Sequence, residues 1–90
     1  MSDDDVLRRL RESAPRMGAV DLALLLERIL GRPISDADLI FRFKQAFPKI
    51  PIPTLYEASA WHRIDPGEGM KRGTLTDHDF ECLLRGFLSS

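Results

Sequence analysis

AVDLALLLERIL, residues 19–30, is apolar around most of the circumference that a helix would present. Its main apolar arc consists of six residues at helical spacing: Ala19, Leu22, Leu25, Leu26, Ile29 and Leu30. A helix that is apolar on nearly every side is buried on nearly every side. We therefore predict that a helix over residues 18–30 is the central element of the fold and that the other helices pack around it.

Both sides of this segment carry signals for the starts of further helices. At four places a hydroxyl residue precedes an acidic residue by three positions, the spacing at which an N-cap side chain accepts a hydrogen bond from the first turn. The four pairs are Ser2/Asp5, Ser35/Asp38, Thr54/Glu57 and Thr76/Asp79. Proline and glycine residues supply the stops. Together these signals predict four more helices, near residues 3–13, 36–47, 54–63 and 77–88.

The signals for β-strands are nearly absent. Residues 48–53, PKIPIP, alternate in polarity as a strand does. Their three prolines lack the N–H donors that a β-ladder needs, so this segment is predicted to be an extended connector. Ninety residues suffice for one core. We expect a single all-α domain over residues 1–90, a compact fold of about five short helices in orthogonal or bundle-like packing.

Charge and cysteine content exclude several classes of protein. Thirteen basic and fourteen acidic residues give a net charge of −1, which does not suit a binder that relies on bulk positive charge to hold nucleic acid. Cys82 is the only cysteine, so no internal disulfide forms, and a reducing compartment is indicated. The acidic first five residues differ from a secretory signal, and the run Leu22–Leu26 is too short to cross a bilayer. We expect a cytoplasmic protein with no membrane partner.

The candidate binding residues are apolar side chains that the predicted helix faces leave over. Phe41 points away from the apolar face of the third helix, and the fourth helix has no single apolar stripe. Tyr56 and Ile64 fall on one side of that fourth helix, and Trp61 falls on the other. Aromatic residues of this kind are enriched at binding hot spots. We therefore predict a partner surface containing Phe41, Tyr56, Trp61 and Ile64; a core position for Trp61 is the alternative that the sequence leaves open.

The glycine-rich loop over residues 65–73 lacks the signature of a phosphate cradle, because it follows no predicted strand and has no Gly-Lys-Ser/Thr ending. A glycine-rich loop between helices is usually a connector. If this one has a role, presenting Lys71 and Arg72 to a partner is the expected one.

No metal or cofactor site is predicted. Gly73-Thr74-Leu75 followed by Asp79-Phe80 is similar to the back of an EF-hand calcium loop, but the ligand positions then fall on Glu68, Met70 and Arg72. A thioether and a guanidinium do not coordinate Ca²⁺. His78 and Cys82 lie one helical turn apart, yet a structural zinc ion needs about four ligands, and only His62 remains. Without a nucleophile paired to a base, an enzyme is not expected.

The main alternative function is DNA binding. The helices near 18–30 and 36–47, joined by a turn at Gly31, could form a helix-turn-helix with Arg42, Lys44 and Gln45 on the recognition helix. Acidic residues at the start of that helix and the balanced net charge weaken this interpretation, since DNA phosphates would repel the carboxylates. Nucleic acid is therefore not the partner we expect.

The remaining profile is that of a small protein that acts by stoichiometric binding. A short chain with balanced charge and surplus aromatic surface suits an inhibitor or a bacterial immunity-type protein that masks a toxin or an enzyme. Ten arginines against three lysines hint at a bacterial source with GC-rich DNA. A homodimer is the other use that an uncovered apolar face could have. The leading hypothesis is a cytoplasmic protein-binding domain that needs no cofactor.

Overall fold

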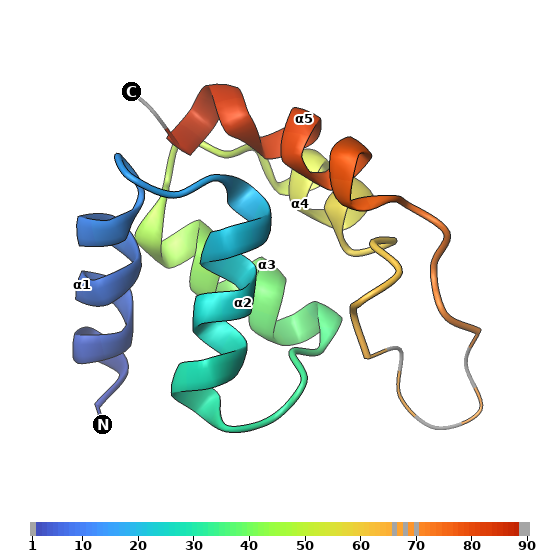
Figure 1. Ribbon diagram of the computed structural model, residues 1–90, viewed down its shortest axis with the longest axis horizontal. Helices are drawn as coiled ribbons and strands as arrows, with labels where there is room; N and C mark the ends of the chain where they lie inside the picture. Colours follow the sequence, from blue (N-terminus) through green and yellow to red (C-terminus); the bar gives the residue numbers. More distant parts are fainter. Residues whose placement is uncertain (1, 66, 68, 70, 89–90) are drawn as a thin grey trace.

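The computed structural model describes residues 2–65, 67, 69 and 71–88 (Figure 1). Within these residues the chain forms five helices: α1 (Asp3–Ser13), α2 (Ala19–Leu30), α3 (Asp36–Ala46), α4 (Ile52–Ala58) and α5 (Asp77–Leu88). No strand occurs in the described part, only isolated bridges between Ser35 and Asp65 and between Trp61 and Leu75. The predicted all-α class of short packed helices is confirmed.

The main helix contacts form a closed ring in the order α1, α2, α5, α4, α3 and back to α1. Figure 1 shows α1 and α2 side by side, with α3 behind them and α5 lying across the start of α2. The buried apolar side chains form one continuous cluster inside this ring, and the largest of them are Trp61, Phe43 and Phe80. α2 contributes four buried residues to that cluster: Ala19, Leu22, Ala23 and Leu26. None of the described helices, of which the longest have 12 residues, has the length and hydropathy that a bilayer crossing requires.

Three of the four predicted N-caps are present. The Ser2 hydroxyl accepts from the Asp5 backbone, and Ser35 forms a reciprocal capping box with Asp38. Thr76 and Asp79 exchange the same two hydrogen bonds at the start of α5, at 3.1 and 3.4 Å. These caps satisfy backbone donors that a helix leaves without partners at its first turn, which is why the sequence signal was reliable here.

The fourth helix differs from its prediction at both ends. It begins at Ile52 rather than Thr54, with Pro51 as N-cap and Pro53 in the first turn. Proline fits there because the first backbone N–H groups of a helix have no intrahelical acceptor. The helix ends at Ala58 rather than residue 63, because the chain then turns to pair with Leu75. In that pairing the Leu75 N–H donates to the Ala60 carbonyl at 3.0 Å and the His62 N–H donates to the Leu75 carbonyl at 2.9 Å.

This turn corrects two of the predicted partner-surface residues. Trp61 and Ile64 lie after α4 rather than on it, and their side chains are 0 % and 2 % exposed. Trp61 stacks on Phe80 of α5 with ring centroids 4.1 Å apart. The assignment to a surface assumed that helical periodicity continued to residue 63, and it does not. Trp61 has the core position that the sequence left open.

The start of α2 is capped by a residue from a distant part of the chain. Its N-cap, Gly18, has no side chain to offer, and the Glu81 carboxylate of α5 instead accepts from the Ala19 and Val20 N–H groups at 2.7 and 3.2 Å. Any side chain at position 18 would collide with that carboxylate. A negative charge at this end of α2 also complements the helix dipole. Glu81 therefore links the two helices that the ring brings into contact.

Glu81→Ala should lower the free energy of unfolding by about 1–2 kcal/mol, because two backbone donors at the start of α2 lose a charged acceptor. Chemical denaturation followed by circular dichroism measures the change. Glu12→Ala, at an exposed position near the end of α1, is the matched control and should stay within about 0.5 kcal/mol of the parent chain. Equal stabilities of the two variants would contradict the cap.

Candidate functional site

Exposed large apolar side chains are few in the described part of the chain. They are Met17, Phe41, Ile52 and Tyr56. Phe41 and Tyr56 are 67 % and 62 % exposed, so these two predicted surface residues do lie at the surface. Single exposed apolar residues are normal in folded proteins. Whether these residues belong to a site therefore depends on the side chains and hollows next to them.

Tyr56 lies on the outer face of α4. Leu55 and Ala58 turn inward to the core, which leaves Tyr56 and Ile52, four residues apart, on the side that faces solvent. Ile52 is 40 % exposed and therefore extends the apolar strip by one turn. α4 thus presents an aromatic and an aliphatic side chain together.

Phe41 lies in a different environment. It lines a small hollow where α1 meets α3, together with Asp3, Asp38 and Arg42. Arg42 is ion-paired there with Asp3 at 3.3 Å and with Asp38 at 3.9 Å. The predicted single surface is therefore divided: two of its four apolar residues are buried, and the two exposed ones lie on different helices in different surroundings.

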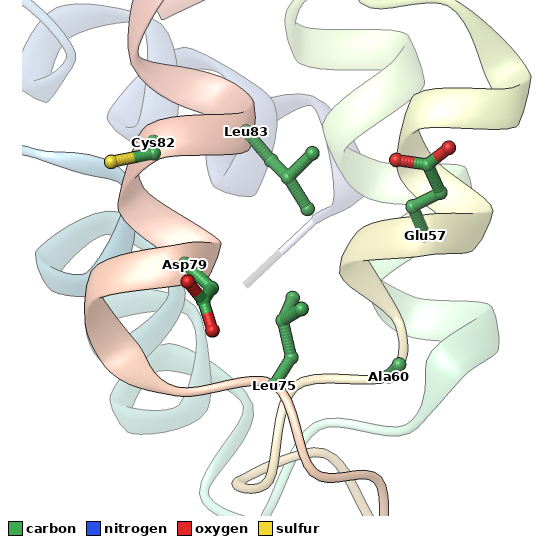
Figure 2. Close-up of a pocket in the computed structure, with 6 residues that line it drawn as sticks. All are labelled: Glu57, Ala60, Leu75, Asp79, Cys82 and Leu83. Atoms are coloured by element: carbon green, nitrogen blue, oxygen red, sulfur yellow. The ribbon is translucent and has the colours of Figure 1, made fainter.

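Helical periodicity gave no sign of a groove of about 590 Å³ between α4 and α5 (Figure 2). Its lining residues come from both helices and from the segments that join them: Glu57, Ala60, Leu75, Asp79, Cys82 and Leu83. Figure 2 shows Leu83 pointing from α5 toward α4, and Leu75 pointing in from the connecting chain. The lining is mainly apolar, while Glu57 on one wall and Asp79 on the other bring carboxylates to the rim. Neither Leu75 nor Ala60 lies within a helix, so helical periodicity could not place them here.

The groove depends on a close backbone approach. The pairing of Ala60 with Leu75 brings the chain after α4 alongside the chain before α5. Gly73 lies at this crossing, where an added Cβ would overlap the carbonyl group of Ala60. Position 73 therefore has room for glycine but not for a residue with a Cβ atom.

Asp77, the first residue of α5, holds the same junction through its side chain. Its Oδ1 atom accepts from Trp61 Nε1 at 2.8 Å and from Arg63 Nε at 3.0 Å, and it lies 2.9 Å from His62 Nε2. The Arg63 guanidinium also donates to Oδ2 at 3.1 Å. Hydrogen bonds from Arg63, and next from Trp61, hold the pKa of the Asp77 carboxyl well below its usual range. The carboxylate stays charged and ties three consecutive residues to α5.

The two predicted basic residues of the loop are exposed. The Arg72 guanidinium donates to the carbonyl groups of His62 and Ile64, at 3.3 and 3.5 Å, so it braces the chain after α4. Lys71 lies at the surface beside it. Of the three positions compared with calcium ligands, Glu68 and Met70 lie outside the described residues.

Within the described residues, no group of three or more His, Cys, Asp or Glu side chains could hold a metal ion. Cys82 and His78 are exposed on α5, and the Cys82 Sγ atom lies 3.5 Å from His78 Nε2. In Figure 2 the thiol points away from the centre of the groove. These two residues alone do not make a structural metal site.

The helix-turn-helix alternative gains no support from the geometry. α2 packs mainly on α1 and α5, while α3 packs mainly on α1 and α4. Arg42 is paired with acids, and the Lys44 ammonium donates to the Pro48 and Ile50 carbonyl groups, both at 2.8 Å. Gln45 is the exposed member of the three predicted base-reading residues. Two of these three side chains are therefore engaged in contacts within the fold.

Comparisons with protein-family models, with curated proteins and with solved structures find no match to this chain.

Gly73→Ala should lower the free energy of unfolding by about 1–3 kcal/mol, because the new Cβ forces the Ala60 and Leu75 segments apart. Gly86→Ala is the matched control: position 86 lies within α5 with open space around it, so alanine should stabilise the helix by about 0.5–1 kcal/mol. Thermal or chemical denaturation of the two variants measures the sign of each change in the free energy of unfolding. Stabilisation by both substitutions would contradict the close approach at position 73.

The Asp77 network predicts a pH dependence of stability. A carboxyl whose pKa is lower in the folded than in the unfolded chain stabilises the fold fully above its ordinary pKa of 3.8, and this contribution is lost as the pH falls toward the lower folded value. Asp38, whose pKa the Arg32 side chain lowers to about 2, acts in the same direction. The free energy of unfolding should therefore fall between about pH 5 and about pH 2.

Asp77→Asn should be less stable than the parent chain at pH 7 and should lose less stability on acidification, so that the two curves approach each other near about pH 2. Denaturant titrations across this range make the comparison. Parallel curves for the two chains would show that Asp77 does not contribute in this way.

Proposed function

We propose that this chain is a stoichiometric protein-binding domain whose partner docks on the α4 side of the molecule. The observation that carries the proposal is the position of exposed Tyr56 and Ile52 on α4, the helix that also forms one wall of the mainly apolar groove. Exposed aromatic side chains are typical anchors of protein interfaces. Polar or charged side chains around them then form the rim.

Within this class we propose an inhibitor or immunity-type role, in which the chain masks a toxin or an enzyme in the bacterial cytoplasm. The support is the composition of the chain: a net charge of −1 and a strong preference for arginine over lysine. A masking protein needs a rigid surface and no reacting groups. Its affinity comes from how well a few anchors are desolvated rather than from contact area alone.

Tyr56→Ala should weaken partner binding by roughly tenfold or more, since removal of a hot-spot aromatic costs about 2 kcal/mol or more. The chain, tagged and expressed in its native host, should co-purify with one polypeptide near one-to-one, and the Tyr56 variant should lose it. Circular dichroism should report an unchanged fold, because the side chain is 62 % exposed.

Phe41→Ala is the matched control, an exposed aromatic on α3 in other surroundings. Loss of the partner in this variant and not in the Tyr56 variant would move the binding surface to the junction of α1 and α3. Failure of any polypeptide to co-purify in fixed proportion would reject the proposed function.

A further inference from the structure

The α4–α5 groove combines three features that together describe what could fill it. Apolar side chains of Leu75, Leu83 and Ala60 line it, two helices form its walls, and carboxylates stand on both sides. Each feature restricts the chemistry of an occupant.

The apolar lining requires an occupant with apolar side chains. Leu75 and Leu83 are partly buried and pack against the core cluster, while parts of both side chains face the groove. Covering them would remove apolar surface from water, which is favourable in proportion to the area covered. The volume of about 590 Å³ has room for more than one large side chain.

The helical walls indicate the backbone conformation of the occupant. In α4 and α5 the backbone groups are used within the helices, and Ala60 and Leu75 pair with each other and with His62. An extended segment laid in the groove would bury its own N–H and C=O groups against walls that offer them no partners. A helix satisfies its backbone internally and presents only side chains to such walls.

The rim indicates the charge of the occupant. Glu57 is exposed on the α4 wall, and its carboxylate has no hydrogen-bond or ion-pair partner among the described residues. Asp79 on the α5 wall is also exposed, and one of its carboxylate oxygens accepts from the Thr76 N–H. Two negative groups around an apolar hollow are complementary to a segment that carries lysine or arginine beside its apolar side chains.

The basic helix of the chain itself does not have the required form. α1 carries Arg8, Arg9 and Arg11, but its apolar residues Val6 and Leu10 are buried in its own core. Arg8 is paired with Asp5, and Arg11 donates to the last carbonyl groups of α3. Within the described residues, a second copy therefore offers no free basic amphipathic helix, which favours another protein as the occupant.

We propose that the groove between α4 and α5 binds an amphipathic α-helix of the partner protein, with its apolar side chains against Leu75 and Leu83 and a lysine or arginine beside Glu57 and Asp79. This inference rests on the proposed protein-binding function and specifies the chemistry of the partner. Tyr56 precedes Glu57 on α4 but does not line the groove, so its contact with the partner would lie outside the helix-binding site.

A displayed library of random peptides of about 16 residues, roughly four helical turns, tests the proposal on the full chain. Selected peptides should carry apolar residues at i, i+3, i+4 and i+7 with lysine or arginine beside them, and should become helical on binding. Amide chemical shifts of the isotope-labelled chain should change around Ala60, Leu75 and Leu83. Extended or acidic peptides, or shift changes centred on Phe41, would overturn the inference.

Glu57→Lys should weaken binding of a selected peptide by about five- to tenfold, because an attraction at the rim becomes a repulsion, and raising the salt concentration should reduce the difference. Glu12→Lys makes the same charge change on α1, outside the groove, and should alter affinity by less than about twofold. Equal effects of the two substitutions would reject the basic partner helix in favour of nonspecific electrostatic attraction. Chemical shifts of the groove amides that change with protein concentration in the absence of peptide would reject it in favour of a second copy of the chain.

The proposed protein-binding function and the proposed partner helix can be rejected independently of each other. If a polypeptide co-purifies through Tyr56 but the selected peptides are not basic helices in the groove, the protein-binding function stands and the partner helix is wrong. If peptides bind in the groove but no polypeptide co-purifies, the proposed function fails and the groove retains only a capacity for helix binding.

Discussion

The burial of Trp61 is the interaction on which the C-terminal half of the fold depends. Its ring stacks on Phe80 with centroids 4.1 Å apart, and its Nε1 atom donates to Asp77 at 2.8 Å. Both partners belong to α5, so one side chain fixes the chain after α4 against α5 through an apolar and a polar contact. An indole needs both kinds of partner when it is fully buried. Arg63, two residues later, reinforces the same attachment.

This attachment is what creates a groove. Because the chain turns out of α4 at residue 59 and pairs with Leu75, α4 and α5 stand apart at their outer edges while their inner faces share the core. Leu75 and Ala60 then line the space between the helices. A fourth helix continuing to residue 63 would have removed the pairing and the lining together. The candidate site is therefore a consequence of where a short helix ends.

The charges of this chain are largely used to hold the fold. Arg11 caps the end of α3, Arg32 is paired with Asp38, and Arg63 is paired with Asp77. Glu81 caps the start of α2 from across the molecule. Internal use of so many basic groups leaves the apolar groove with an acidic rim, even though the whole chain is nearly neutral. Net charge alone could not indicate that local sign.

Local signals in the sequence determined the all-α class and nearly all bounds of four helices, because caps such as Ser35 with Asp38 and stops such as Gly31 act within a few residues. The exposure of Phe41 and Tyr56 also followed from helical spacing. Tertiary structure alone decided that Trp61 and Ile64 lie inside, that Glu81 caps α2, and that a groove opens beside α4. Each of these depends on contacts between residues far apart in the chain, such as Ala60 with Leu75, and periodicity carries no information about which distant segments meet.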